Sequence, residues 1–508
     1  MNKFLILISV FILMIRTDVP ARGFDEATEE DKVQVLQSPI LYSILSLRFE
    51  EADSLLRISA ESGLQNPAWF YLKNYLDFLD AVISGDRSSY ESYLENSGRW
   101  IDSIQKLFGD DPGARIHMSS IHLQSSFLSA YYGENFNAAK HFYNAHRLLR
   151  QSLAAGSTEA GEDGEGGDGG NGGLILRNRG LIALGIGSVP EEYRWLLKIF
   201  GMKGEIAEGL GYLEDYLFSA TGPERIEACI IFQFVSHSVN AGLSEDDVLV
   251  EGCGDSLTLS RYSMALVDLA SGRSKKVVKN LEHYQQSDEE RALPYLDLLL
   301  GEAMLNGLAP GANKPLERFL GEHSGENYRH YAYHKLSWHY LLSGEWEQYQ
   351  LTRQKVIDSG EAYLDADRQA LSEARDTLVV NSELLQARLL FDGGYYREAL
   401  SQLKDDPAIV LRNRKDSIEY KYRLARVYDR IDDKNTAIRY YQEVLASGSG
   451  EKWYFVPNSA LQLGIIHEAE GEKEQALGYY RECLKINRSA YEKSIDYKAR
   501  QGIRRLED

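Results

Sequence analysis

Two histidines four residues apart have the clearest spacing for chemistry in this sequence. His330 and His334 bound the stretch "HYAYH", and this spacing places two metal ligands on one face of a helix. The stretch lacks the glutamate of H-E-x-x-H, and no third ligand stands nearby. His467 opens "HEAEG" without a second histidine. We therefore expect ordinary core or surface histidines and no metal site.

Motifs of nucleotide binding and nucleophilic catalysis are absent or lack their structural context. The sequence contains no G-x-S-x-G elbow and no Walker A motif. Gly164, Gly166 and Gly169 match G-x-G-x-x-G, but no strand precedes them. A Ser-His-Asp triad would leave no motif, because its members meet only in space. We expect no catalytic residue and no cofactor, and we keep a carbohydrate- or lipid-processing enzyme on a helical scaffold as the alternative.

The charge of the chain excludes one class of partner. Its 508 residues carry a formal net charge of −20. Phosphate-backbone binding depends on clustered Lys and Arg that release counterions. We therefore expect no nucleic-acid partner.

A helical-hairpin repeat accounts for the small and aromatic residues near the C-terminus. In "SALQLGIIHEAEGEKEQALGYYRECL", Gly464 allows close helix approach, Gly471 opens a turn, Ala476 is small at the helix crossing and Tyr480 fills the space between hairpins. This order is that of the tetratricopeptide repeat. Ala399, Ala437 and Ala476 recur at intervals of 38 and 39 residues, slightly beyond the ~34 of the ideal unit.

Weaker copies of the same pattern occur upstream. "FLSAYYGENFNAAKHFYNAHRLL" fits with Gly133 and Ala138, "YHKLSWHYLLSGEWEQY" fits with Gly344, and "LSLRFEEADSLL" fits with Ala52. Each hairpin cannot bury its apolar face alone, so neighbours must stack. The sequence therefore predicts an all-α superhelix of tetratricopeptide-like hairpins, a solenoid, closed by a capping helix in "YEKSIDYKARQGIRRLED".

Composition divides the chain into five predicted segments. Glycine and acidic residues dominate 156–173, which predicts a flexible loop because glycine is costly to order and the carboxylates repel. Pro190 and two glutamates predict a helix that ends near Phe200. The segments are a signal peptide at 1–21, helical repeats at 22–155, the loop at 156–173, degenerate repeats at 174–375, and tetratricopeptide repeats with the capping helix at 376–508.

The N-terminus resembles a secretory signal peptide. Lys3 precedes an apolar run from Phe4 to Ile15, and Val19 and Ala21 occupy the small-residue positions before a cleavage point. We expect cleavage after about Ala21 and a periplasmic or secreted protein without a transmembrane span. Retention of the segment as an anchor is the alternative.

The cysteines do not form a disulfide framework. Cys229, Cys253 and Cys483 are an odd and sparse set for an exported protein. We expect buried free thiols, with a Cys229–Cys253 bridge as the alternative.

One central segment resembles a known family. "GIGSVPEEYRWLLKIFGMKGEIAEGLGYL" is similar to the middle region of the eukaryotic family that comprises the inclusion-body-clearance protein and tetratricopeptide repeat protein thirty-nine. The matching positions are Gly187, Ser188, Pro190, Phe200, Gly201, Gly204 and Gly209. "LPYLDLLLGEAMLNGL" and "VPNSALQLGIIHEAEGEKEQALGYY" look similar too, so the resemblance spans most of residues 110–500.

The resemblance implies an all-helical scaffold without an assigned catalytic residue. Family members are intracellular and are linked to protein clearance and lipid homeostasis. The N-terminal segment departs from that pattern, and so does the order of the turn from Phe200 to Glu205. We therefore expect a bacterial exported relative and do not carry the cellular roles over.

The first helix of each C-terminal hairpin offers candidate partner-binding residues. We aligned its second, fifth, ninth and twelfth positions. They hold Asn381, Leu384, Arg388 and Phe391 in the first unit, Glu419, Tyr422, Arg426 and Asp429 in the second, and Asn458, Leu461, Ile465 and Glu468 in the third. Arg, Tyr and Asn can hold an extended peptide by planar and amide hydrogen bonds. We predict that Asn381, Arg388, Tyr422, Arg426 and Asn458 bind a protein or peptide; solvation or pairing within the chain is the alternative.

Overall fold

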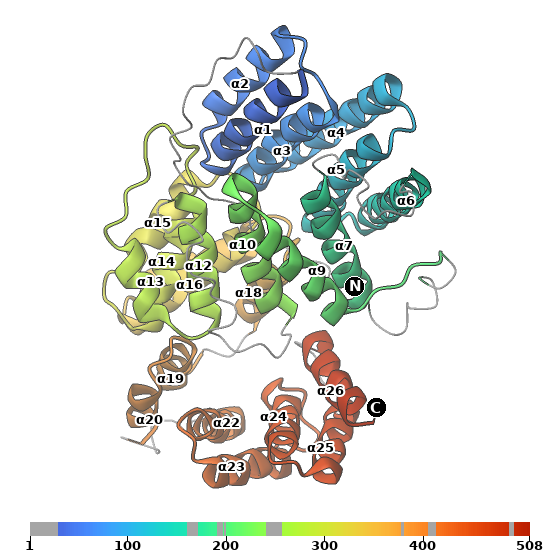
Figure 1. Cartoon of the computed structure of the whole chain (residues 1–508). Helices are drawn as coiled ribbons and strands as arrows, with labels where there is room; N and C mark the ends of the chain where they lie inside the picture. Colours follow the sequence, from blue (N-terminus) through green and yellow to red (C-terminus); the bar gives the residue numbers. More distant parts are fainter. Residues whose placement is uncertain are drawn as a thin grey trace.

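The computed structural model describes most of the chain. It covers residues 29–159, 171–189, 197, 200–239, 257–376, 380–404, 413–486 and 492–507. Within these residues the regular elements are all α-helices and no strand occurs (Figure 1). The predicted all-α fold is therefore confirmed. The predicted signal peptide and the helix predicted after Pro190 lie outside the described residues, apart from single positions at the end of that helix.

Antiparallel hairpins form the first half of the molecule. α1 pairs with α2, α3 with α4 and α5 with α6, after which α7, α9 and α10 pack in succession. The bounds are α1 (Glu29–Leu45), α2 (Phe49–Glu61), α3 (Pro67–Ser84), α4 (Arg87–Phe108), α5 (Pro112–Tyr131), α6 (Asn135–Glu159), α7 (Gly172–Gly187), α9 (Ile206–Ser219) and α10 (Gly222–Val239).

Two further groups of helices complete the array. The central group is α12 (Thr258–Ala270), α13 (Ser274–Leu281), α14 (Tyr295–Asn306), α15 (Asn313–Glu322), α16 (Arg329–Leu342), α17 (Trp346–Asp358) and α18 (Asp365–Arg375). The C-terminal group is α19 (Ser382–Asp392), α20 (Tyr396–Lys404), α22 (Arg414–Arg430), α23 (Lys434–Ser447), α24 (Phe455–Ala469), α25 (Lys473–Lys485) and α26 (Glu492–Glu507). α26 packs on α24 and α25, as expected of a capping helix.

The turn inside each repeat hairpin is built from a left-handed residue. Gly133, Gly394 and Gly471 have φ values of 73°, 84° and 77°, and each precedes the buried small alanine of its hairpin by five residues. Asp432, with φ 65°, occupies the same place in the α22–α23 hairpin. The repeat frame read from the sequence therefore coincides with the helix turns.

The close approach predicted at Gly464 occurs around one aromatic ring. Tyr480 is fully buried between α24 and α26. A Cβ at Gly464 would lie 2.5 Å from its ring, and a Cβ at Gly502 would lie 2.4 Å from the opposite part. Because real Cβ contacts are not this short, glycine is required on both sides of Tyr480.

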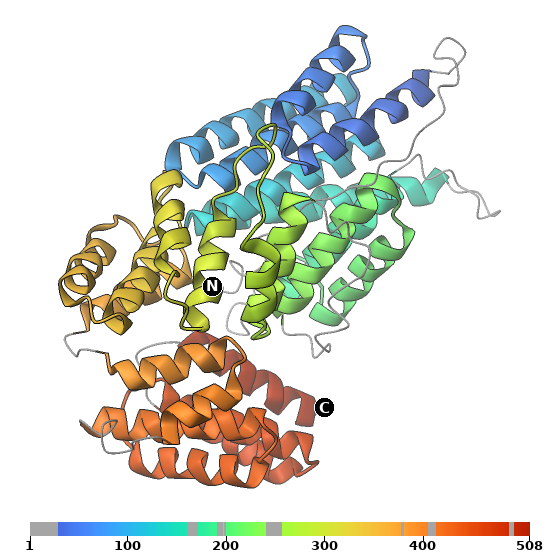
Figure 2. The same cartoon turned by 90° about the vertical axis from the view of Figure 1, so that its left-hand side faces the viewer.

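The helices do not simply follow one another, because the central segment returns to the N-terminal hairpins. Arg291 pairs with Asp80 at 3.0 Å, and its backbone N–H donates to the Leu47 carbonyl at 2.7 Å. The Glu326 N–H donates to the Gly85 carbonyl at 3.0 Å. One hydrophobic cluster consequently runs from α1 to Leu364, whereas smaller clusters stabilise the C-terminal hairpins, which form a separate layer in Figure 2.

Two expectations about local structure need correction. α6 continues to Glu159 and α7 begins at Gly172, so helix occupies both ends of the predicted 156–173 loop; 160–170 lie outside the described residues. Cys229 is disulfide-bonded, so the expected free thiol is wrong there, whereas Cys483 is a buried free thiol. Cys253 lies outside the described residues. No helix of the described residues is long and apolar enough to cross a membrane.

Candidate partner-binding face

The first helices of the C-terminal hairpins lie side by side. α22 contacts both α19 and α24, and α24 contacts α26. The ninth positions of α22 and α24 remain open, since the Arg426 side chain is 30% exposed and Ile465 is 40% exposed. We call the side chains of Arg388, Arg426, Ile465 and Lys498 the A-helix face.

The fifth positions are closed. Leu384, Tyr422 and Leu461 are at most 2% exposed. The ninth position follows the fifth by four residues, about 40° farther round the helix. That rotation separates the hairpin stack from the open side, so Tyr422 packs inside the fold instead of lying on the face.

Arg388 is already held by carboxylates. Its guanidinium lies 3.4 Å from Glu373 and 3.8 Å from Asp392, and it stacks over Trp338 with 4.8 Å to the ring centroid. Pairing within the chain therefore describes this residue well. Its charge is largely balanced.

Arg426 has a different environment. It lies over the Phe391 ring at 4.0 Å, and its nearest carboxylate oxygen belongs to Asp392, at 3.7 Å. It forms no hydrogen bond with the residues that the structure describes. Asp392 is shared with Arg388, so the Arg426 guanidinium keeps hydrogen-bonding capacity and positive charge on the open side.

Lys498 adds a second cation from the capping helix. The residue is exposed, yet desolvation by the surrounding protein, and then the positive charge of Arg426, lower the pKa of its amino group. Two cationic side chains, one from α22 and one from α26, therefore lie near enough to influence each other. Arg426 belongs to α22 and Lys498 to α26, which are far apart in the chain, so nothing in the sequence indicates that their charges interact.

The asparagines have structural partners. Asn381 is buried, caps α19 by accepting from the backbone N–H groups of Glu383 and Leu384, and donates to Asp416 at 2.9 Å. Asn458 accepts from Gln462 at 3.0 Å and remains partly exposed. Of the five predicted residues, the structure thus brings Arg388 and Arg426 together at Asp392.

The histidines selected by spacing lie in the core. His330 is fully buried, with its Nδ1 2.6 Å from the Val356 carbonyl, and His334 contacts Glu373 at 3.1 Å. Burial lowers the pKa of His334. The two rings thus face different partners, as the packing interpretation predicted.

His467 also packs in the repeat. It is buried, and its ring stacks on Tyr479 with centroids 5.3 Å apart. A ring nitrogen of His467 lies within 4.8 Å of carboxylate oxygens of Glu470 and Glu472, both of which are exposed, and Nδ1 is 2.5 Å from Glu472 Oε2. Exposed acidic groups of this kind are common without a metal ion, and the stacking accounts for the histidine.

Comparisons with known proteins add little beyond this geometry. No protein-family model and no curated protein matches the chain. The resemblance to the family of the inclusion-body-clearance protein and tetratricopeptide repeat protein thirty-nine therefore stays a prediction.

Three solved structures have some likeness to the chain. The TPR domain of P58(IPK) has 13% identity and a TM-score of 0.21, and the alignment covers 94% of this chain and 98% of that chain. A monomeric mutant of IFIT1 with m7Gppp-AAAA has 11% identity, a TM-score of 0.24 and coverages of 95% and 87%. The APC/C hetero-tetramer Cut9–Hcn1 has 10% identity and a TM-score of 0.24, and the alignment covers 95% of this chain and 97% of that chain. With TM-scores this low, the fold class rests on the hairpins described above: the chain is an all-α array of tetratricopeptide-like hairpins.

Proposed function

We propose that the protein is a non-catalytic helical-repeat scaffold that binds a carboxylate-bearing segment of a partner protein on the A-helix face. One observation carries this proposal: Arg426 is held over Phe391, while its one carboxylate contact among the described residues, to Asp392, is 3.7 Å long. A carboxylate from a partner can form the shorter, bidentate hydrogen bonds for which a guanidinium is suited.

The surroundings of Arg426 support the same partner chemistry. Lys498 lies close enough to Arg426 for the two charges to act on each other, although the whole chain carries −20. Ile465, one repeat farther along, offers an exposed aliphatic contact beside the charged region. A peptide with an acidic residue followed by an apolar one fits this order, because the aliphatic contact contributes affinity and the ion pair contributes specificity.

We also propose that this scaffold works in the cell envelope. The support is the N-terminal pattern of Lys3, an apolar run and Ala21. Intact-mass measurement of the protein recovered from the producing cell's envelope fraction tests this proposal. A mature chain that begins at residue 22 is expected, and an unprocessed chain in the cytosolic fraction would contradict it.

The binding proposal is tested by capture from envelope extracts on the immobilised chain. We expect Arg426→Ala to lower partner capture about tenfold, which corresponds to ~1.4 kcal/mol, and Arg388→Ala/Arg426→Ala to lower it further. Arg439→Ala is the matched control, because Arg439 is an exposed arginine of α23 that stacks over Tyr440 at 4.8 Å. Circular dichroism must show equal helicity for all variants.

A peptide array then identifies the recognised group. Segments of the captured partner are synthesised with each Asp and Glu replaced in turn by Asn and Gln. One replacement is expected to abolish the difference between wild type and Arg426→Ala. Equal capture by wild type and Arg426→Ala would refute the A-helix face as the binding surface.

A further inference from the structure

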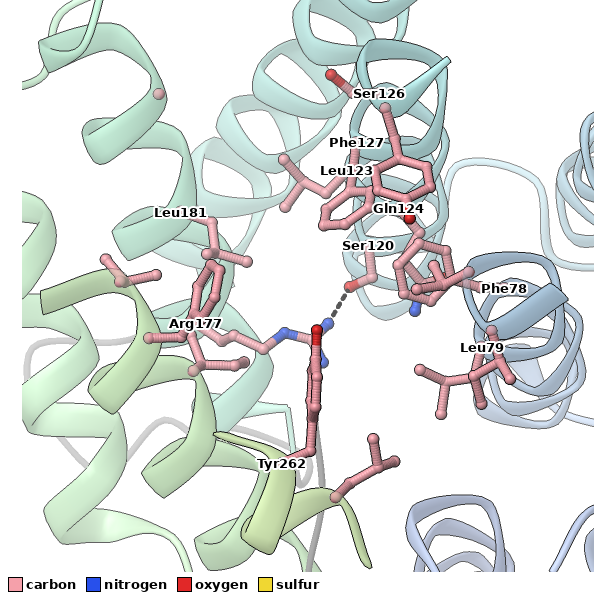
Figure 3. A pocket seen from close by; sticks show the side chains of 18 of the residues that line it. Phe78, Leu79, Ser120, Leu123, Gln124, Ser126, Phe127, Arg177, Leu181 and Tyr262 are labelled. Carbon is pink, nitrogen blue, oxygen red and sulfur yellow. Dashed lines mark hydrogen bonds between the residues drawn. The ribbon is translucent and has the colours of Figure 1, made fainter. Parts of the chain in front are cut away.

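The return of the central helices to the N-terminal hairpins leaves a partly enclosed cavity between them. Its volume is about 150 Å³. α3, α5, α7, α10 and α12 all contribute to its wall, and Figure 3 shows their side chains converging on it. Most of the lining is apolar, with Phe78, Leu79, Leu123, Phe127 and Leu181 as examples.

Among the described residues, one charged side chain lines this cavity, but its hydrogen-bonding capacity is used. Arg177 donates to Tyr71 and Glu227 at 2.6 and 2.7 Å from Nη1, and to Ser120 at 2.8 Å from Nη2. Its Nε and Nη2 also donate to Asn178, at 3.3 and 3.2 Å. A guanidinium has five N–H donors, so all of them have acceptors within the protein.

The charge of Arg177 is also balanced inside the fold. Its ion pair with Glu227 is almost completely buried, and the second carboxylate oxygen of Glu227 accepts from Tyr216. Burial raises the pKa of Tyr71 and Tyr216, which keeps both phenols neutral. An anionic ligand would therefore find no unpaired cation here and would meet the cost of desolvating its own charge.

Two other polar side chains on the wall are paired as well. Gln124 accepts from Asn74 at 2.7 Å, and Ser126 donates to the Ala138 carbonyl at 2.8 Å. Water needs two to four polar partners to be stable in a cavity. A wall of this composition favours an apolar occupant, and apolar cavities of roughly this size bind small hydrocarbons.

We infer that this cavity binds a slim, uncharged apolar molecule, such as a hydrocarbon chain. The ligand would contact α3 and α5 on one wall and α7, α10 and α12 on the others, with the ring of Tyr262 extending toward Arg177 (Figure 3). It would thereby connect elements that are separated by more than one hundred residues in the chain. This site is distinct from the A-helix face and does not depend on the proposed function.

The uncharged dye N-phenyl-1-naphthylamine, which fluoresces in apolar surroundings, tests the inference on the full chain. Leu181→Trp and Leu123→Trp fill the cavity from two different helices, and each is expected to weaken dye binding at least tenfold. Leu181→Ala enlarges the same space and is expected to retain binding. Ile465→Trp on the A-helix face is the control and is expected to bind as wild type does.

Competition with decanol and decanoate identifies the ligand class. Decanol is expected to displace the dye, and decanoate is expected to compete no better. The inference is overturned if the wild-type protein does not bind the dye. It is also overturned if the tryptophan variants keep wild-type helicity and still bind the dye as wild type does, or if decanoate competes tenfold better than decanol. Partner capture by Leu181→Trp is measured in parallel, so failure here is distinguishable from failure at Arg426.

Discussion

Substitution of Gly464 by alanine tests the packing of the repeat most directly. The added Cβ would lie 2.5 Å from the Tyr480 ring, which is fully buried. The ring cannot retreat, because Gly502 lies against its other side. We expect the C-terminal hairpin to be destabilised although alanine is the better helix former.

The expected magnitude follows from two opposing contributions. Replacing a helical glycine by alanine stabilises a helix by about 1 kcal/mol. Overpacking a close-packed core costs about 1–3 kcal/mol, and a ring confined on both sides places this site at the upper end. The net destabilisation is therefore about 2 kcal/mol, or roughly a thirtyfold increase in local opening.

Hydrogen exchange measured by mass spectrometry is the suitable assay, because a chain of 508 residues is not expected to unfold in one step. Amides of α24 and α25 should exchange about thirtyfold faster in Gly464→Ala. Gly478→Ala is the matched control: Gly478 lies in α25, and a Cβ there meets nothing within 4 Å. That variant should exchange more slowly, by the ~1 kcal/mol of helix propensity.

Equal slowing of exchange in both glycine variants would refute this account of the packing. It would mean that the helices move apart without cost. The glycine would then not be what allows α24 to approach α25 at Tyr480.

Two further predictions concern buried charges. Glu227→Gln leaves the Arg177 guanidinium without its counter-charge and should lower the free energy of unfolding by about 3–5 kcal/mol. Hydrogen exchange in α7 and α10 measures this loss. The double variant Arg177→Met/Glu227→Gln should recover part of it. Burial raises the pKa of the Asp367 carboxyl from its ordinary value of 3.8 to about 6. The protonated carboxyl therefore stabilises the fold fully below about pH 3.8, and this contribution is lost as the pH rises through about 6. Between about pH 4 and 7, thermal melts should therefore show the free energy of unfolding of wild type falling by up to about 3 kcal/mol relative to that of Asp367→Asn. Parallel pH profiles of the two proteins would contradict the raised pKa of Asp367.

The repeat itself was predictable because its signals are local. Gly471, Ala476 and Tyr480 stand within one hairpin, and the turn and the helix crossing that they form depend on spacing along a few helical turns. The candidate binding residues were only partly predictable. The repeat frame indicates the side of the helix, but Tyr422 and Arg426 differ by about 40° on it, and only the width of the hairpin stack decides which of them is open.

Contacts between distant segments had no signal in the sequence. Arg291 meets Asp80 across 211 residues, and Arg177 meets Glu227 across 50. The all-α class, the hairpin register and the excess of negative charge follow from residue types and their periods, since these quantities are properties of short stretches or of composition. The return of the central helices, the apolar cavity and the placement of Lys498 near Arg426 depend on how small rotations between successive hairpins accumulate. Many individually weak packing contacts determine those rotations, so they are known only once the whole chain is folded.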